Sequence, residues 1–217
     1  MRLTHLTEFR PSLHGFAFSN LWDDGTWKVT LPGGRVFRVV LRGRCGGMAF
    51  AALDLFHTPG TPAAQLTDSK LPPKGSPLER YIGQRQLGSL IGGGSSNLVR
   101  FAAWTFMPAG GKGGVGRRTR REAGRVLAAM AAGLPVPLGL IAADRLSGLG
   151  TNHQVVAWGI DNDDAQVRIR IYDPNHPLRD DVVLQFDWAG EGAVIETVGG
   201  LERARWRGVF VERYRHR

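Results

Sequence analysis

Cysteine is almost absent from this sequence, in which Cys45 is the only one among 217 residues. A chain with one cysteine cannot form an internal disulfide, so side-chain packing has to hold the fold together. Closely spaced pairs of cysteine and histidine are missing as well, because Cys45, His57, His153 and His176 stand far apart. A structural zinc site needs such pairs. We therefore expect neither a metal nor a cofactor.

Long apolar segments are also missing. No stretch approaches the roughly 20 apolar residues that span a membrane. The N-terminus, MRLTHLTEFRPSLHGF, lacks the apolar core of a secretory signal. The sequence thus predicts a protein that acts in the cytoplasm, or one that is exported without a cleaved signal peptide.

Acidic side chains are the minority, with 19 against 28 basic ones and a formal net charge of +9. A basic surface attracts anionic partners. Four arginines crowd one loop and the start of the helix after it: Arg117, Arg118, Arg120 and Arg121. Cations oppose the dipole at a helix start, and this local cost favours an anionic ligand or partner there. The loop itself, AGGKGGVGRRT, is similar to a phosphate-binding loop, but Arg117 stands where that motif has lysine, so we expect no nucleotide.

An irregular arm over residues 1–44 precedes a helical region. Apolar residues recur every four positions from Cys45 to His57, which predicts a helix with one buried stripe. Ser76-Pro77-Leu78-Glu79 combines an N-cap, a first-turn proline and a capping-box glutamate, so a second helix is expected through about Leu87.

A third helix is expected from Thr119, where Glu122 completes another capping box, to Gly133. A shorter helical piece over residues 98–104 is weaker in pattern.

After Pro137 the pattern changes to short strands, rich in β-branched and aromatic residues and separated by Gly, Asn and Asp. They cover residues 138–143, 153–160, 166–172, 182–187, 193–198 and 205–214. Helices that come first and an antiparallel meander that comes second predict an α+β protein. We expect a single domain with an arm (1–44), a helical lobe (45–135) and a sheet lobe (136–217), the helical layer packed on the sheet.

The segment RGRCGGMAFAALDLF places Cys45 at the start of the first helix, between Gly43 and the pair Gly46-Gly47. Unpaired backbone N–H groups and the positive end of the helix dipole favour a thiolate at that place. The glycines would let a substrate backbone approach the sulfur. A structural cysteine would more naturally lie within the apolar stripe, so we interpret Cys45 as a nucleophile.

A thiol nucleophile needs a base, and His153 begins the apolar strand HQVVAWGI after a glycine-rich loop. Asp173 stands at the end of the next strand. Two antiparallel strands joined by a tight turn bring such positions side by side, so we expect the carboxylate of Asp173 to orient the imidazole. Asn175 is the alternative orienter, and His14 is the next candidate for the base.

The segments RGRCGGM, NHQVVAWGI and IYDPNHP together resemble the papain-like cysteine peptidase superfamily. The likeness is to its bacterial Cys-His-Asp branch, which includes the peptidases that remove double-glycine leaders, and it covers residues 40–60 and 150–178. It implies a papain-like fold with the nucleophile at a helix N-terminus. It also implies the roles of nucleophile, base and orienter for Cys45, His153 and Asp173.

One position departs from that family pattern. The family has a glutamine about six residues before the cysteine, which donates to the oxyanion, and this chain has Val39 there. Another donor must act beside the backbone N–H of Cys45. The candidates are Asn20 and His14, the polar residues of the aromatic segment PSLHGFAFSN.

These features predict a cysteine peptidase or amidase that acts on a peptide or protein through an acyl-enzyme at Cys45. Two alternatives stay open. The same triad would serve a transglutaminase-like acyltransferase or a glutamine deamidase, activities that occur among bacterial toxins. Alternatively, the chain is a basic binding module on a papain-like scaffold that turns over no substrate and binds polyanions in a salt-sensitive way.

Overall fold

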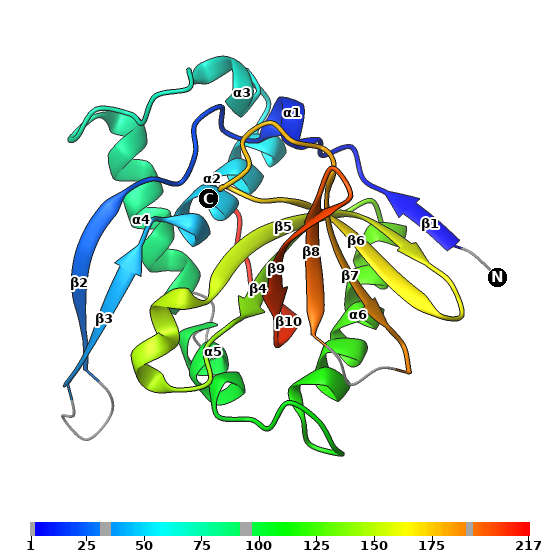
Figure 1. The fold of residues 1–217 in the computed structure, drawn as a ribbon. Helices are drawn as coiled ribbons and strands as arrows, with labels where there is room; N and C mark the ends of the chain where they lie inside the picture. Colours follow the sequence, from blue (N-terminus) through cyan, green and yellow to red (C-terminus); the bar gives the residue numbers. More distant parts are fainter. Residues whose placement is uncertain (1–2, 31–35, 92–96, 190–192) are drawn as a thin grey trace.

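A computed structural model describes residues 3–30, 36–91, 97–189 and 193–217, with the backbone alone for 24–30, 36–42 and 146–147 (Figure 1). Its centre is a curled antiparallel sheet of eight strands in the order β10-β4-β5-β6-β7-β8-β9, with β1 paired to β5. These strands are β1 (Leu3–Leu6), β4 (Val136–Ile141), β5 (His153–Asn162), β6 (Gln166–Tyr172), β7 (Val182–Asp187), β8 (Val194–Val198), β9 (Leu201–Trp206) and β10 (Gly208–Val211). A separate hairpin consists of β2 (Asp23–Thr30) and β3 (Val36–Arg42).

The helices surround this sheet (Figure 1). They are α1 (Pro11–His14), α2 (Cys45–His57), α3 (Ala63–Leu66), α4 (Pro77–Ile91), α5 (Asn97–Thr105) and α6 (Val115–Ala131), with a short 3₁₀ helix, η1 (Leu146–Thr151). Among the described residues, no helix combines the length and the apolar character that crossing a membrane requires.

Strand β5 is the centre of both main cores. Successive side chains of a strand point to opposite faces. On one face, Val155 and Ala157 belong to the apolar cluster that includes α6. On the other face, Val156 and Trp158 belong to the cluster that includes α2. The helices α2 and α6 therefore cover opposite faces of the sheet.

This arrangement contradicts the predicted papain-like architecture, although the protein is α+β as expected. In the described part of the chain the helices do not form a single N-terminal layer on the sheet, because α2 and α6 pack on different faces of β5. Nor are strands confined to the second part of the chain. The arm predicted as irregular contains β1, which pairs with the end of β5 from Leu3↔Asn162 to Leu6↔Gly159, and the hairpin of β2 and β3.

A buried ion pair fixes α2 against α4. Nε of Arg85 lies 2.6 Å from Oδ2 of Asp54, and both side chains are almost fully buried. The hydroxyl groups of Tyr81 and Tyr214 also donate to Asp54, each at 2.8 Å. Satisfying the carboxylate in this way offsets the cost of its burial. The C-terminal half of the helix that begins with Cys45 is thus anchored to α4.

Most of the predicted elements are confirmed, with shifted ends. The bounds of α2, β6 and β7 agree with the predictions, and Ser76 does cap α4, since the N–H of Glu79 donates to its hydroxyl at 3.3 Å. The second capping box is wrong. Helix α6 begins four residues before Thr119, and the side chains of Thr119 and Glu122 instead accept N–H groups of β10, from Val209 at 3.1 Å and Val211 at 2.9 Å.

The last predicted strand is divided in two, because β9 ends at Trp206 and β10 begins at Gly208. Arg207 stands between them. Its guanidinium donates to the backbone carbonyls of Thr105, Ala143 and Met107. A side chain bound to three carbonyls holds the chain where it leaves one edge of the sheet and joins the other.

Candidate active site

Cys45 is the first residue of α2 and follows a turn that leaves β3. Gly43 in this turn has a φ of 90°, which glycine adopts without strain. A Cβ on Gly43 would also lie 2.4 Å from Oδ1 of Asn20. The first N–H groups of a helix lack partners within the helix and carry the positive end of its dipole. Cys45, a half-buried residue, therefore stands at the positive end of the α2 dipole.

The two glycines after Cys45 make room for the protein itself. A Cβ on Gly46 would lie 2.0 Å from Oε1 of Gln154, and one on Gly47 would lie 2.3 Å from the carbonyl oxygen of Ile82. Both glycines are buried. The expectation that they open the sulfur to a substrate backbone is wrong. They let the start of α2 approach β5 and α4 closely.

His153 and Asp173 form a buried hydrogen-bonded pair. Nε2 of His153 lies 2.7 Å from Oδ1 of Asp173. The pairing of β5 with β6 aligns Val156 with Tyr172, so the start of one strand lies beside the end of the other. This is the relationship that the interval between the two residues predicts. Only 6% of His153 and 1% of Asp173 is exposed, so water does not compete for the bond.

Cys45 also interacts with the imidazole of His153, through its charge and a hydrogen bond. Burial disfavours the charged ring, but the charges of Asp173 and Cys45 and hydrogen bonds with both side chains outweigh it, and the pKa of His153 lies well above its usual value. For Asp173, burial works against ionisation too. The charge of His153 and hydrogen bonds from His153 and the Asn175 N–H nevertheless hold its pKa below the usual value. The three predicted residues are thus one electrostatic unit.

No family model, curated protein or solved structure matches this chain. What the site does therefore has to follow from its own atoms. The predicted resemblance stays a prediction.

Two asparagines connect the nucleophile to the base. Oδ1 of Asn20 accepts the N–H of Arg44 at 2.5 Å, directly before Cys45. Nδ2 of Asn20 lies 3.4 Å from Oδ1 of Asn175, whose own amide nitrogen lies 3.2 Å from Nε2 of His153. Asn20 thus lies beside the start of α2, and its role as an oxyanion donor stays a prediction. Asn175 contacts the base but does not replace Asp173 as its orienter.

His14 lies outside the site. Its ring packs on Phe9 and Phe56, and Phe56 is near the far end of α2 from Cys45. Its Nδ1 accepts the backbone N–H of Arg10 at 2.9 Å. The predictions of His14 as a base or an oxyanion donor are therefore wrong. The polar ring of His14 is satisfied here by a hydrogen bond from the backbone of its own turn.

Residues around Gln154 were missed by the sequence reasoning. Gln154 follows His153 and points to the other face of β5, where its Nε2 donates to both carboxylate oxygens of Glu212 at 2.9 and 2.8 Å. Its Oε1 accepts from the hydroxyl of Ser89 at 3.2 Å. Burial raises the pKa of Glu212 to about 8, against the opposing effects of Gln154 and Arg100. This network lies directly under Gly46.

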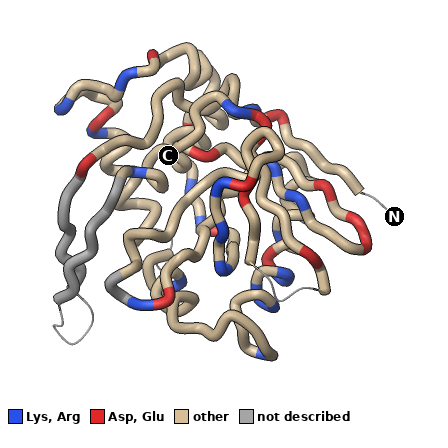
Figure 2. The backbone as a smooth tube through the Cα atoms, viewed as in Figure 1, with Lys and Arg blue, Asp and Glu red and all other residues tan. Residues whose placement is uncertain are grey.

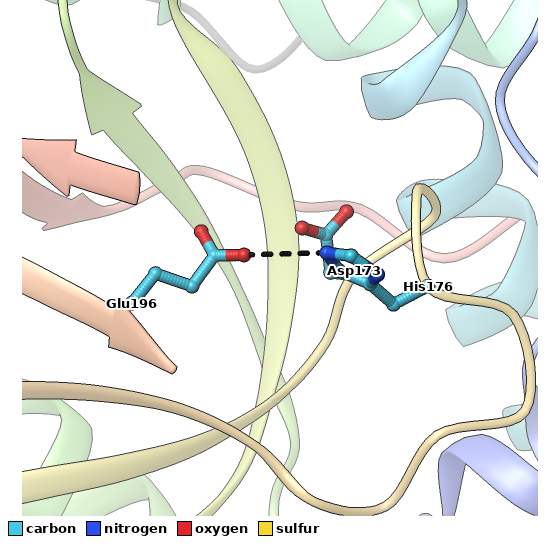
Figure 3. A group of neighbouring side chains, drawn as sticks. All are labelled: Asp173, His176 and Glu196. Atoms are coloured by element: carbon cyan, nitrogen blue, oxygen red, sulfur yellow. Dashed lines mark ion pairs between the residues drawn. The ribbon is translucent and has the colours of Figure 1, made fainter. Parts of the chain in front are cut away.

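Asp173 also belongs to a second polar group, together with His176 and Glu196 (Figure 3). Candidate ligand atoms of Asp173, His176 and Glu196 all lie within 4.8 Å of one another. Both carboxylates already accept hydrogen bonds, Asp173 from His153 and Glu196 from the indole of Trp206 at 2.8 Å. Each of these hydrogen bonds engages one oxygen of its carboxylate, so the group adjoins the triad through Asp173 and reaches Trp206 through Glu196.

The arginine cluster of α6 lies at the first turns of that helix. Arg117, Arg118 and Arg121 are exposed, and the guanidinium groups of Arg117 and Arg118 lie 3.5 Å from carbonyls of the preceding loop. Basic residues also occur along many other elements (Figure 2). An anionic partner for Arg117, Arg118, Arg120 and Arg121 stays a prediction.

Proposed function

We propose that this protein is a cysteine hydrolase that cleaves an amide bond of a peptide or protein through an acyl-enzyme on Cys45. One observation carries the proposal. A buried imidazole, that of His153, is bound on one side to the carboxylate of Asp173 at 2.7 Å and interacts on the other with a thiol at a helix N-terminus. A structural cysteine needs neither a base nor an orienter for that base.

Each residue then has a role in the reaction. Nε2 of His153 is hydrogen-bonded to Asp173. We therefore assign Nδ1 as the atom that accepts the proton of the Cys45 thiol. The imidazole holds the thiol proton, the thiolate attacks the substrate carbonyl, and the imidazolium returns the proton to the leaving amine. Water activated by the neutral imidazole then cleaves the thioester. A pKa of His153 that is raised well above its usual value favours the thiolate–imidazolium pair from which this sequence begins.

Asn20 supports the assignment of an oxyanion site. Oδ1 of Asn20 accepts the N–H of Arg44. This hydrogen bond directs the Asn20 side chain to the turn before Cys45. We assign Nδ2 of Asn20 and the backbone N–H of Cys45 as the two donors to the tetrahedral intermediate. Removing one such donor typically slows catalysis by about 10²–10³-fold.

Alkylation of Cys45 by iodoacetamide across pH tests the proposal. A thiolate held by His153 reacts rapidly at about pH 6, whereas a free thiol titrates near 8.5. The variant His153→Ala should lose this early reactivity by about tenfold or more, and His5→Ala, which alters a histidine of β1, should keep it. Alkylation that follows an ordinary thiol in every variant would overturn the proposal and favour an inert binding module.

A peptide-library screen then defines the reaction. Mass spectrometry of the products separates hydrolysis, which releases peptides, from glutamine deamidation, which releases ammonia, and from acyl transfer, which produces a cross-link. The variant Cys45→Ala is the control in each arm, because it keeps the fold and lacks the nucleophile.

A further inference from the structure

Glu196 is a buried carboxyl group that the proposed mechanism does not use. It lies on β8 between Val194 and Val198, which face the apolar core, and only 2% of it is exposed. Its neighbours across the strands, Leu184 of β7 and Ala204 of β9, carry no charge. A glutamate at such a position costs free energy unless it has partners. Its partners are Trp206, His176 and one residue of the triad, Asp173.

Glu196 and the His153 imidazole are connected by contacts through Trp206 and through Asp173. Nε1 of Trp206 donates to Oε2 of Glu196 at 2.8 Å. The indole of Trp206 lies over the ring of His153, with centroids 5.8 Å apart and an interplanar angle of 16°. Figure 3 shows the Glu196 carboxyl directed at Asp173 and His176. Because Asp173 binds His153, the imidazole is reached from Glu196 by two routes.

We propose that Glu196 is a positioning residue of the triad, which holds His153 through Asp173 and through the Trp206 ring and adjusts the strength of that hold as its carboxyl gains or loses a proton. The inference rests on the proposed function, because it concerns the base of the same site. It makes the site responsive to pH through a group that never touches the substrate.

The charges around Glu196 determine the direction of the effect. The ionisable groups that face it are Asp173, His153 and His176. Burial raises the pKa of Glu196 to about 7, and the charge of Asp173 acts in the same direction. The protonated carboxyl hydrogen-bonds to Asp173, which makes Asp173 a weaker acceptor for the imidazolium. The ionised carboxyl instead places a second negative charge near the ring and stabilises the imidazolium.

The variant Glu196→Gln tests this directly. A glutamine keeps an acceptor for Trp206 and a donor for Asp173, so it imitates the protonated state at every pH. In NMR titrations of the full chain, the ring proton signal of His153, identified by its loss in His153→Ala, should have its midpoint about one pH unit lower in Glu196→Gln than in the wild type. The matched control, Glu202→Gln, alters an exposed glutamate of β9 and should leave the midpoint unchanged.

A second variant leaves the carboxyl intact. Trp206→Phe keeps an aromatic ring over His153 but removes the indole donor to Glu196. Glu196 should then hold its proton to higher pH. The midpoint of the His153 titration should move to lower pH, by a smaller amount than in Glu196→Gln. Trp188→Phe, which removes an indole donor elsewhere on the sheet, is its control and should change nothing. Identical midpoints in the wild type and in Glu196→Gln overturn the inference. Alkylation of Cys45 that needs His153 in both proteins would show that the proposed function survives that result.

Discussion

The backbone of Gly47 lies against α4 so closely that a Cβ there would stand 2.3 Å from the carbonyl oxygen of Ile82. The N–H of Gly47 also donates to Oε1 of the buried Gln86 at 2.8 Å. A backbone carbonyl inside a helix cannot move aside as a flexible side chain can. The close approach of α2 to α4 therefore depends on this glycine.

Gly47→Ala should destabilise the protein by about 2–4 kcal/mol, because the added methyl group has to push two helices apart. Urea unfolding followed by circular dichroism measures the loss. Gly124→Ala is the control, since a Cβ at this helical position of α6 meets nothing within 4 Å, and alanine there should stabilise by about 0.5–1 kcal/mol. Equal stabilities for Gly47→Ala and the wild type would contradict the packing of α2 on α4.

Asp173→Asn should reduce the alkylation of Cys45 at about pH 6 by about tenfold or more. Asparagine keeps an oxygen acceptor for the His153 ring and for the Asn175 N–H but removes the charge. Burial then lowers the pKa of His153 with less to oppose it, so less imidazolium is present to stabilise the thiolate. Rates of iodoacetamide labelling, measured by mass spectrometry, report the change.

The control for this variant is Asp181→Asn, which alters an exposed carboxylate paired with Arg179 at 2.6 Å. It should label at the wild-type rate. An equal rate in Asp173→Asn would mean that Asp173 holds the imidazole without affecting its charge.

Asn20→Ala should separate two properties of the site. Hydrolysis of a peptide found by the library screen should fall by about 10²–10³-fold, because a donor to the oxyanion is lost. Alkylation by iodoacetamide forms no oxyanion, so its rate should change by less than about threefold. Steady-state kinetics and labelling rates on the same preparation measure both. A parallel fall of the two rates would assign Asn20 a structural role in the turn at Gly43.

Local patterns in the sequence predicted that Cys45 begins a helix and that His153 and Asp173 are neighbours. Cys45 begins α2 because glycines precede and follow it and the apolar period starts there. His153 and Asp173 meet because a hairpin with a short turn fixes which ends of β5 and β6 are neighbours. Both arguments use contacts between residues that are close in the sequence, and both agree with the bounds of the elements.

Other features depend on contacts between distant segments. The amphipathic pattern of α6 predicts one buried side but does not reveal which face of the sheet it covers. The pairing of β1 with β5 joins residues more than 150 positions apart. Glu196 did leave a signal, since the alternation of β8 places it on the same side as Val194 and Val198. A carboxyl among core residues indicates a partner, but the partner, Trp206, is supplied by the next strand.

Glu212→Gln should change how stability depends on pH. Burial raises the pKa of Glu212 from its usual 4.5 to about 8, so the folded protein keeps this proton where the unfolded chain has lost it. The stabilising contribution is complete below about pH 4.5 and is lost as the pH rises towards about 8. Relative to the wild type, the free energy of unfolding of Glu212→Gln should therefore rise by roughly 3 kcal/mol between about pH 5 and 8, because glutamine has no proton to lose.

Urea unfolding at several pH values, with Glu202→Gln as an exposed control, measures how the free energy of unfolding changes with pH. Parallel curves for the wild type and Glu212→Gln would mean that Glu212 is ionised throughout, and that Gln154 and Arg100 stabilise its charge fully.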